Sequence, residues 1–246
     1  MDENRTLNNN QIGKFILRID IDKSTPIDFS NVVDALQGEY TSKKIEVQEH
    51  FDINIDEQKN EGNVAKSIFQ RFVLTYVDGA YLKLGSFDNN IIIESNKYRD
   101  NSVYKERIAK IIAIIIEKYG EKISSTRIGM RYINTFPCEN ERDISKVFNP
   151  SDSKSIREGL SKPNISRVLL VSEFNEEDHQ IRIQYGVPNK FYPSIITRPD
   201  LMLDIDVYSL GLQPIIEWED VIRSANHDAF RIFNEYIKES YIEKMR

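Results

Sequence analysis

The sequence predicts an α+β fold in which a curved antiparallel sheet carries two long helices on one face. Runs rich in β-branched and aromatic residues recur along the chain, and short turns join several of them. Each group of such runs is followed by one long apolar helix. A sheet must cover one of its faces and an apolar helix must bury its stripe, so the two kinds of element fit each other.

The first half begins with a strand over residues 15–22, where apolar and polar residues alternate. A short helix over residues 28–37 follows and ends at Gly38. Two strands are then predicted over residues 44–56 and 67–77, separated by a polar loop.

Residues 81–95 read as a hairpin, because two β-rich runs flank a turn that contains Gly85, Asp88 and Asn89. Residues 101–120 form the clearest helix of the sequence. Its isoleucines are too dense for a thin amphipathic stripe, so we expect it to be largely buried, with Gly120 as its end.

The second half repeats this order of elements. It starts with a strand over residues 123–136 and ends with a long helix from Glu219 to Lys244, whose acidic first turn suits the helix dipole. Between them the sequence predicts short helical pieces over 142–160 and strands over 165–174, 180–187 and 201–210.

The chain is therefore expected to be a single α+β domain over residues 1–246, or two structurally similar halves over 11–120 and 121–246. Residues 1–10 are polar and predicted to be disordered. With both long helices on one face of the sheet, the other face would be exposed and free to bind.

Composition excludes several classes of function. The net charge of −6 disfavours non-specific nucleic-acid binding, which needs a basic surface, although a local basic groove stays open. The longest apolar run, residues 108–120, is too short to span a membrane, and the N-terminus has no signal-peptide core. Cys138 is the only cysteine, which points to a reducing compartment. A cytoplasmic protein is predicted.

The run TRIGMRYIN, residues 126–134, is the main candidate site. In a strand, Arg127 and Arg131 flank Gly129 on one face, while Tyr132 and Asn134 lie on the other. One interpretation is a binding face in which Arg127, Arg131, Tyr132 and Asn134 are the central contacts and the arginines bind a carboxylate, a phosphate or an acidic partner.

The alternative is that the two arginines pair with acids on a neighbouring strand. Asp204 and Asp206 share one face of their strand and are suitable partners. The same two carboxylates could instead hold a divalent metal in a nuclease or hydrolase, with Arg127 or Arg131 holding phosphate. No zinc-ligand spacing and no phosphate-binding glycine motif accompanies them, so neither a metal nor a cofactor is predicted.

Two further features leave alternatives open. Residues 185–199 combine prolines and aromatics, so Tyr185, Phe191 and Tyr192 line a small-ligand pocket between sheet and helix, or else the segment is a packed connection. His227 in the last helix is expected to share a partly buried face with Phe230.

The strand Arg127–Asn134 resembles the central motif R-[IV]-G-[LM]-R-[YF]-[IV]-N of a sporadically distributed family of prokaryotic proteins of unassigned function. The resemblance extends over nearly the whole chain, including the strand Leu203–Asp206 and the run His227–Phe233 of the last helix. A tryptophan before the buried helix is lacking, and Tyr104 takes its place. The scattered distribution implies mobile genes, such as those of defence or toxin–antitoxin systems, and brings no catalytic residues with it.

The sequence thus favours a non-enzymatic cytoplasmic binding protein that contacts a protein partner or a second copy of itself. A metal-dependent nuclease or hydrolase using Asp204 and Asp206, and a small-ligand pocket, are the alternatives.

Overall fold

The structure is a computed structural model that describes residues 12–56, 61–98 and 101–245. The predicted disorder of residues 1–10 lies outside this part of the chain. The first half of the described chain forms these elements: β1 (Ile12–Ile21), α1 (Phe29–Ala35), β2 (Ser42–Asp56), β3 (Glu61–Thr75), β4 (Tyr81–Gly85), β5 (Asn90–Ser95) and α2 (Ser102–Tyr119).

The second half opens with the strand that carries the arginine motif and closes with a long helix, as predicted. Its elements are β6 (Ser124–Phe136), α3 (Glu141–Val147), α4 (Pro150–Leu160), β7 (Val168–Glu176), β8 (His179–Val187), β9 (Leu201–Pro214), α5 (Trp218–Tyr236) and α6 (Glu239–Ile242). Single turns of 3-10 helix cover Ile215–Glu217 and Glu243–Met245.

All the described strands join one open antiparallel sheet in the order β2-β3-β4-β5-β1-β6-β9-β8-β7, which confirms the α+β prediction. The two halves meet at the central pair β1 and β6, and each half supplies one side of the sheet. Each half begins with this central strand, returns through antiparallel strands and ends in a long helix. The order of elements is therefore similar in the two halves, while a duplication of the sequence stays a prediction.

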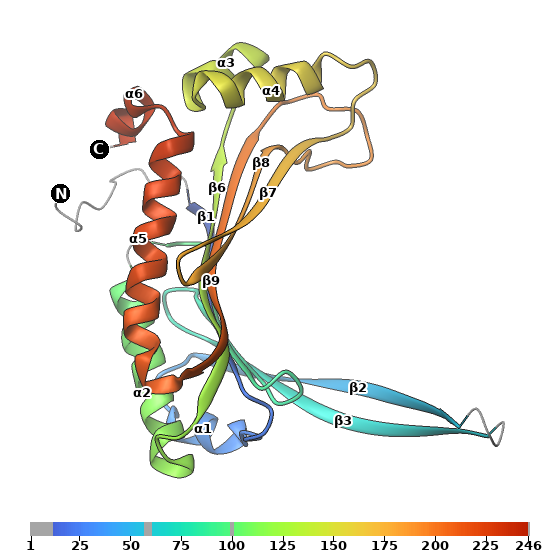
Figure 1. Ribbon diagram of the computed structural model, residues 1–246, viewed down its shortest axis with the longest axis vertical. Coiled ribbons are helices and arrows are strands. Elements are labelled where there is room, and N and C mark those ends of the chain that lie inside the picture. Colours follow the sequence, from blue (N-terminus) through green and yellow to red (C-terminus); the bar gives the residue numbers. More distant parts are fainter. Residues whose placement is uncertain (1–11, 57–60, 99–100, 246) are drawn as a thin grey trace.

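Both long helices lie on the same face of the sheet (Figure 1). Helix α5 packs on β6 and β9, and α2 packs on β1, where the ring of Tyr104 lies 5.1 Å from that of Phe15. The alternation of β1 decides which residues reach this core: every second side chain from Phe15 to Ile21 is buried. On the opposite face the sheet is concave, because β7 and β8 curve away from the helices and the β2–β3 hairpin extends in the same direction (Figure 1).

The last helix is shorter than the sequence predicts. It ends at Tyr236, because Ile237 is extended and forms a β-bridge with Phe148. The backbone N–H of Asn149 donates to the carbonyl of Tyr236, and that of Lys238 donates to the carbonyl of Val147. A long-range backbone contact thus outweighs the helical periodicity of the segment.

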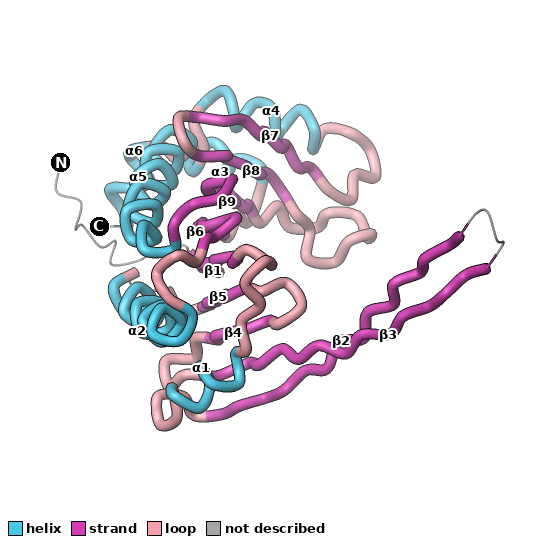
Figure 2. Tube along the Cα trace, turned by 60° about the horizontal axis from the view of Figure 1, so that its bottom comes forward, coloured by secondary structure: helices cyan, strands magenta, loops and turns pink. Residues whose placement is uncertain are grey.

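Strand β3 begins at Glu61, six residues before the predicted start at residue 67. The hairpin of β2 and β3, here called the arm, pairs continuously from Ser42 with Thr75 to Asp56 with Glu61. It projects beyond the body of the protein (Figure 2). Apart from Val64 and Ala65, residues 61–66 are polar or glycine, so hydrophobic periodicity gives no signal for the start of this strand.

Two histidines lie in opposite environments. His179 at the start of β8 is buried, and its Nδ1 lies 2.8 Å from Oδ2 of Asp228 in α5. His227 on α5 is exposed, as is Phe230, so the prediction that this pair forms a partly buried face is wrong. The helix buries the stripe that contains Ile222, Ala225 and Ala229 instead.

Replacing His179 by alanine should lower the free energy of unfolding by about 2 kcal/mol, because Asp228 loses a buried hydrogen-bond partner. His227→Ala is the matched control and should change stability by less than about 0.5 kcal/mol. Urea denaturation of both variants measures the difference. Equal effects of the two substitutions would show that the His179–Asp228 contact does not anchor α5 to the β7–β8 hairpin.

Candidate functional site

Strand β6 lies in the middle of the sheet and divides the arginine motif between its two faces. Arg127 and Arg131 lie on the concave side of the sheet, opposite the helices. This side is called here the open face. Its central positions are Ile16, Arg18 and Asp20 of β1, Arg127, Gly129 and Arg131 of β6, and Asp204, Asp206 and Tyr208 of β9. Tyr132 and Asn134 lie in the core beneath α5. The four predicted central contacts therefore do not form one surface.

Tyr132 and Asn134 have structural partners. The Tyr132 hydroxyl donates to Oδ1 of Asn226 in α5 at 2.6 Å, and burial raises the pKa of this tyrosine well above its usual value, which keeps the hydroxyl a donor. Asn134 Nδ2 donates to the carbonyl of Leu203 at 3.1 Å. The two residues hold a helix and a neighbouring strand to β6, and both side chains are buried.

Both arginines pair with the aspartates of β9. The guanidinium of Arg131 contacts Asp204 through two hydrogen bonds, from Nε at 2.8 Å and from Nη2 at 2.6 Å. Nη2 of Arg127 donates to both carboxylate oxygens of Asp206, at 3.0 and 3.2 Å. The two parallel hydrogen bonds of Arg131 form a bidentate pair, which is strong and geometrically specific, whereas Arg127 uses one nitrogen and its Nε is buried without a partner among the described residues. The structure thus shows the cross-strand pairing that the sequence offered as one alternative.

Burial and charge act against each other at these pairs. Burial raises the pKa of the Asp206 carboxyl, and Arg127 and Arg131 only partly counteract this. The hydrogen bonds to Asp204 raise the pKa of the Arg131 guanidinium, although its burial acts in the opposite direction. Each carboxylate is already held by a guanidinium, and the described residues contain no group of three or more His, Cys, Asp or Glu placed to hold a metal ion.

Gly129 is required by the neighbouring strand. A Cβ at this position would lie 2.4 Å from Cβ of Tyr208 and 2.8 Å from the carbonyl oxygen of Val207. This close approach lets the Tyr208 ring lie under Arg127, whose Cζ is 3.7 Å from the ring centroid. The backbone of β9 and the Cβ of Tyr208 thus occupy the space that a side chain at position 129 would need.

A hollow of about 140 Å³ lies at the centre of the open face. Its lining includes the apolar side chains of Ile16 and Ile92 and the charged groups of Arg18, Arg127 and Arg131. Pockets for drug-sized ligands measure roughly 300–1,000 Å³, so this one is better suited to a single side chain of a partner.

The ion pairs continue across the open face beyond the residues that the sequence indicated. Glu94 of β5 binds Lys14 of β1 at 2.9 Å and Lys83 of β4 at 3.0 Å. Arg18 contacts Asp20 at 2.7 Å. The sequence signal for these residues is only the alternation of charged and apolar positions in the strands, and their partners follow from a strand order that alternation does not reveal.

The three residues of the predicted aromatic pocket differ in burial. Tyr185 is in the core, with its ring 5.0 Å from that of Tyr236, and burial raises its pKa to about 12. Phe191 and Tyr192 are exposed, and the Tyr192 ring lies against the guanidinium of Arg167 at 4.0 Å. One side chain therefore lies in the core and two at the surface.

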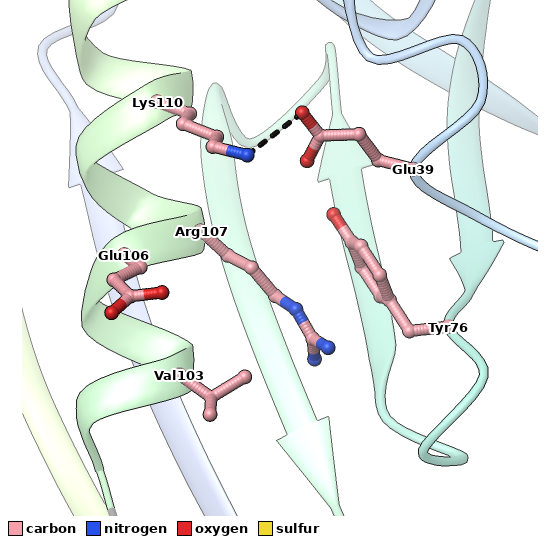
Figure 3. A pocket seen from close by; sticks show the side chains of 6 residues that line it. All are labelled: Glu39, Tyr76, Val103, Glu106, Arg107 and Lys110. Atoms are coloured by element: carbon pink, nitrogen blue, oxygen red, sulfur yellow. Dashed lines mark hydrogen bonds and ion pairs between the residues drawn. The ribbon is translucent and has the colours of Figure 1, made fainter.

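A second hollow, of about 340 Å³, lies beside α2 (Figure 3). Its charged groups are already engaged: Lys110 binds Glu39 at 2.9 Å, and Arg107 stacks on Tyr76 at 3.9 Å and binds Asp78 at 2.9 Å. The Tyr76 hydroxyl points toward Glu39 in Figure 3, but it is buried without a hydrogen-bond partner among the described residues, so a ligand in the hollow would not reach it.

No family model matches this chain, and no curated protein matches it either. The likeness of Arg127–Asn134 to the sporadically distributed prokaryotic family therefore stays a prediction. Among the described residues, no helix combines the length and the apolar character that crossing a membrane requires.

Gly129→Ala should lower the free energy of unfolding by roughly 1–3 kcal/mol, because the added methyl meets Tyr208 and the β9 backbone. Gly13→Ala is the control, since its nearest neighbour is the flexible side chain of Thr135 at 3.1 Å. Thermal melting of both variants compares them, and an unchanged melting temperature for Gly129→Ala would contradict the packing argument.

Glu94→Gln should cost about 1 kcal/mol of stability at pH 7. Burial alone would raise the pKa of Glu94, but its hydrogen bonds from Lys14 and Lys83 lower it below the ordinary 4.5. The folded state therefore favours the charged form, and this stabilisation is present above pH 4.5 and disappears as the pH falls through the folded pKa.

Urea denaturation between pH 7 and about pH 3 should thus show the wild type and Glu94→Gln converging at low pH. Glu158→Gln, which changes an exposed acid 3.8 Å from Lys154, should match the wild type throughout. A difference between wild type and Glu94→Gln that stays constant with pH would rule out the linkage.

Proposed function

We propose that this protein is a non-enzymatic binding protein that holds a protein partner on the open face of its sheet. The observation that carries the proposal is the arrangement of this face, where paired charges and the side chains of Ile16 and Ile92 together line a hollow of side-chain size. A partner surface of mixed charge, with one apolar side chain to insert, is complementary to it.

The charge pairing favours protein over nucleic acid as the partner. Arg18, Arg127, Arg131 and Arg182 each contact a carboxylate of the open face. A site for nucleic acid would need cations that are available to neutralise phosphates, and the net charge of the whole chain is −6. A protein surface that carries both signs of charge can exchange partners with these ion pairs without leaving any of them unpaired.

The concave shape of the sheet limits where such a partner can bind. The arm limits the face on one side and the curved strands β7 and β8 limit it on the other (Figure 1). A partner seated against β1 and β6 would therefore contact three parts of the sheet at once, which increases the area buried without any rearrangement of the chain.

The single thiol supports a binding role in a reducing compartment, which we take to be the cytoplasm. Cys138 is buried and forms no disulfide. Burial raises its pKa to about 11, so the nucleophilic thiolate is scarce at neutral pH. The resemblance to a sporadically distributed family places the partner, as an expectation, within a mobile defence or toxin–antitoxin-type module.

The test blocks the hollow without breaking an ion pair. Ile16→Arg puts a long charged side chain into the hollow and should remove a stoichiometric protein partner when the tagged full chain is purified from its host. Phe230→Arg introduces the same group on the exposed side of α5 and should retain the partner.

Circular dichroism establishes that both variants are folded. A partner that survives Ile16→Arg in a folded protein would show that the open face is not the docking surface. Nucleic acid in the purified complex, detected by its absorbance ratio, would contradict the preference for a protein partner.

A further inference from the structure

The arm leaves one long edge of the sheet available for pairing. Strand β2 is the last of the described strands on this side of the sheet, and it runs for 15 residues with β3 as its neighbour. A two-stranded hairpin is marginally stable alone in water, and an uncovered edge strand is a template for another strand. In both views the outer part of the arm stands clear of the helices and of the second half, while its inner end begins near α1 (Figures 1 and 2).

The hydrogen bonds of β3 identify which backbone groups of β2 face outward. Ser86 donates to the carbonyl of Gln70, so Gln70 directs its backbone groups to β4 and the next residue, Arg71, directs its own to β2. Arg71 pairs with Glu46, which therefore faces β3. By alternation, the residues of β2 that direct N–H and C=O to the free edge are Lys43, Ile45, Val47 and Glu49.

These four residues also share one side of the strand and form a self-complementary series. Ile45 and Val47 are exposed, at 46% and 61%. Lys43 precedes them and Glu49 follows them, so the series reads basic, apolar, apolar, acidic. Reversing the strand direction reverses the series, which brings each charge opposite the other sign and each apolar residue opposite an apolar one.

We propose that two copies of this chain pair antiparallel through the free edges of β2, about a two-fold axis at Glu46. Lys43 then lies opposite Glu49 of the second copy, and Ile45 lies opposite Val47 of the second copy. The same contacts repeat on the other side of the axis, as an isologous interface requires. This inference concerns another surface than the open face and is independent of the proposed function.

Other registers are less favourable. A shift of one residue would place residues of one copy whose backbone groups face β3 opposite residues of the second copy whose backbone groups face outward. A shift of two would place Ile45 opposite the carboxylate of Glu49. In the proposed register the side chain of Glu46 lies opposite Glu46 of the second copy, on the face of the strand away from Ile45 and Val47. Each Glu46 carboxylate is neutralised by Lys44 at 2.9 Å and lies across from Arg71.

The other edge of the sheet is the competing site. Strand β7 exposes Val171 and Phe174, so β2 of one copy could pair with β7 of the next. Such a head-to-tail contact would leave both terminal edges free and would continue into longer chains. The self-complementary series in β2 favours the closed pair, because it satisfies all four outward residues within two copies.

Charge reversal tests the register directly. The wild-type full chain should be a dimer by sedimentation equilibrium. Lys43→Glu and Glu49→Lys should each weaken the dimer about 10-fold to 100-fold, because each places two like-charge pairs in the interface. An equimolar mixture of the two variants should form a heterodimer, since position 43 of each variant then meets an opposite charge at position 49 of the other. For the same reason the double variant K43E/E49K should dimerise by itself.

Glu173→Lys is the matched control, since it reverses an exposed charge on the β7 edge and should leave the dimer intact. Glu49 also contacts Lys66 within its own hairpin at 2.7 Å, so melting temperatures are compared to confirm that every variant is folded. A monomeric wild type, single variants that dimerise normally, or a mixture that fails to associate would each overturn the proposal. Loss of association in Glu173→Lys would assign the contact to β7 instead.

Ile16→Arg should keep the dimer, so this result does not depend on the open face.

Discussion

The structure depends on the pleat of the two central strands, β1 and β6, which separates apolar from charged residues with a period of two. One side supplies the core under α2 and α5, and the other supplies the ion pairs of the open face. A shift of one residue between these strands would move Arg127 and Arg131 under the helices, where an unpaired charge is very costly. The charged face therefore fixes the register as firmly as the core does.

The same constraint explains why the arginines pair within the sheet. On a concave surface the side chains converge, so Arg131 and Asp204 are partly removed from water and must satisfy each other. Gly129 adds to this convergence by admitting Tyr208 against the strand. The hydrogen bonds at the centre of this face are therefore made largely within the sheet. At its centre Asp20, Asp204 and Asp206 each contact an arginine.

The sequence predicted the features that depend on local periodicity. The alternation in β1 and the dense isoleucines of α2 predicted the buried faces, and the shared face of Asp204 and Asp206 offered, as one of several alternatives, the partners of the two arginines. Features set by distant contacts escaped it. Helix α5 stops where Ile237 meets Phe148, and Glu94 finds its lysines only because β5 lies between β4 and β1. No single-strand pattern contains that order.

The inferred dimer has a consequence for the open face. A two-fold axis perpendicular to the sheet at Glu46 keeps the apolar sides of both arms together, so both open faces point to the same side of one continuous sheet. A partner that is itself a dimer, or that repeats the recognised surface, would then bind two faces at once, and its second contact would form at a high effective concentration. Weak binding at each small hollow would suffice for a stable complex. Each copy would thus contribute an interface of modest size, and the dimer would select a partner that presents its binding surface twice.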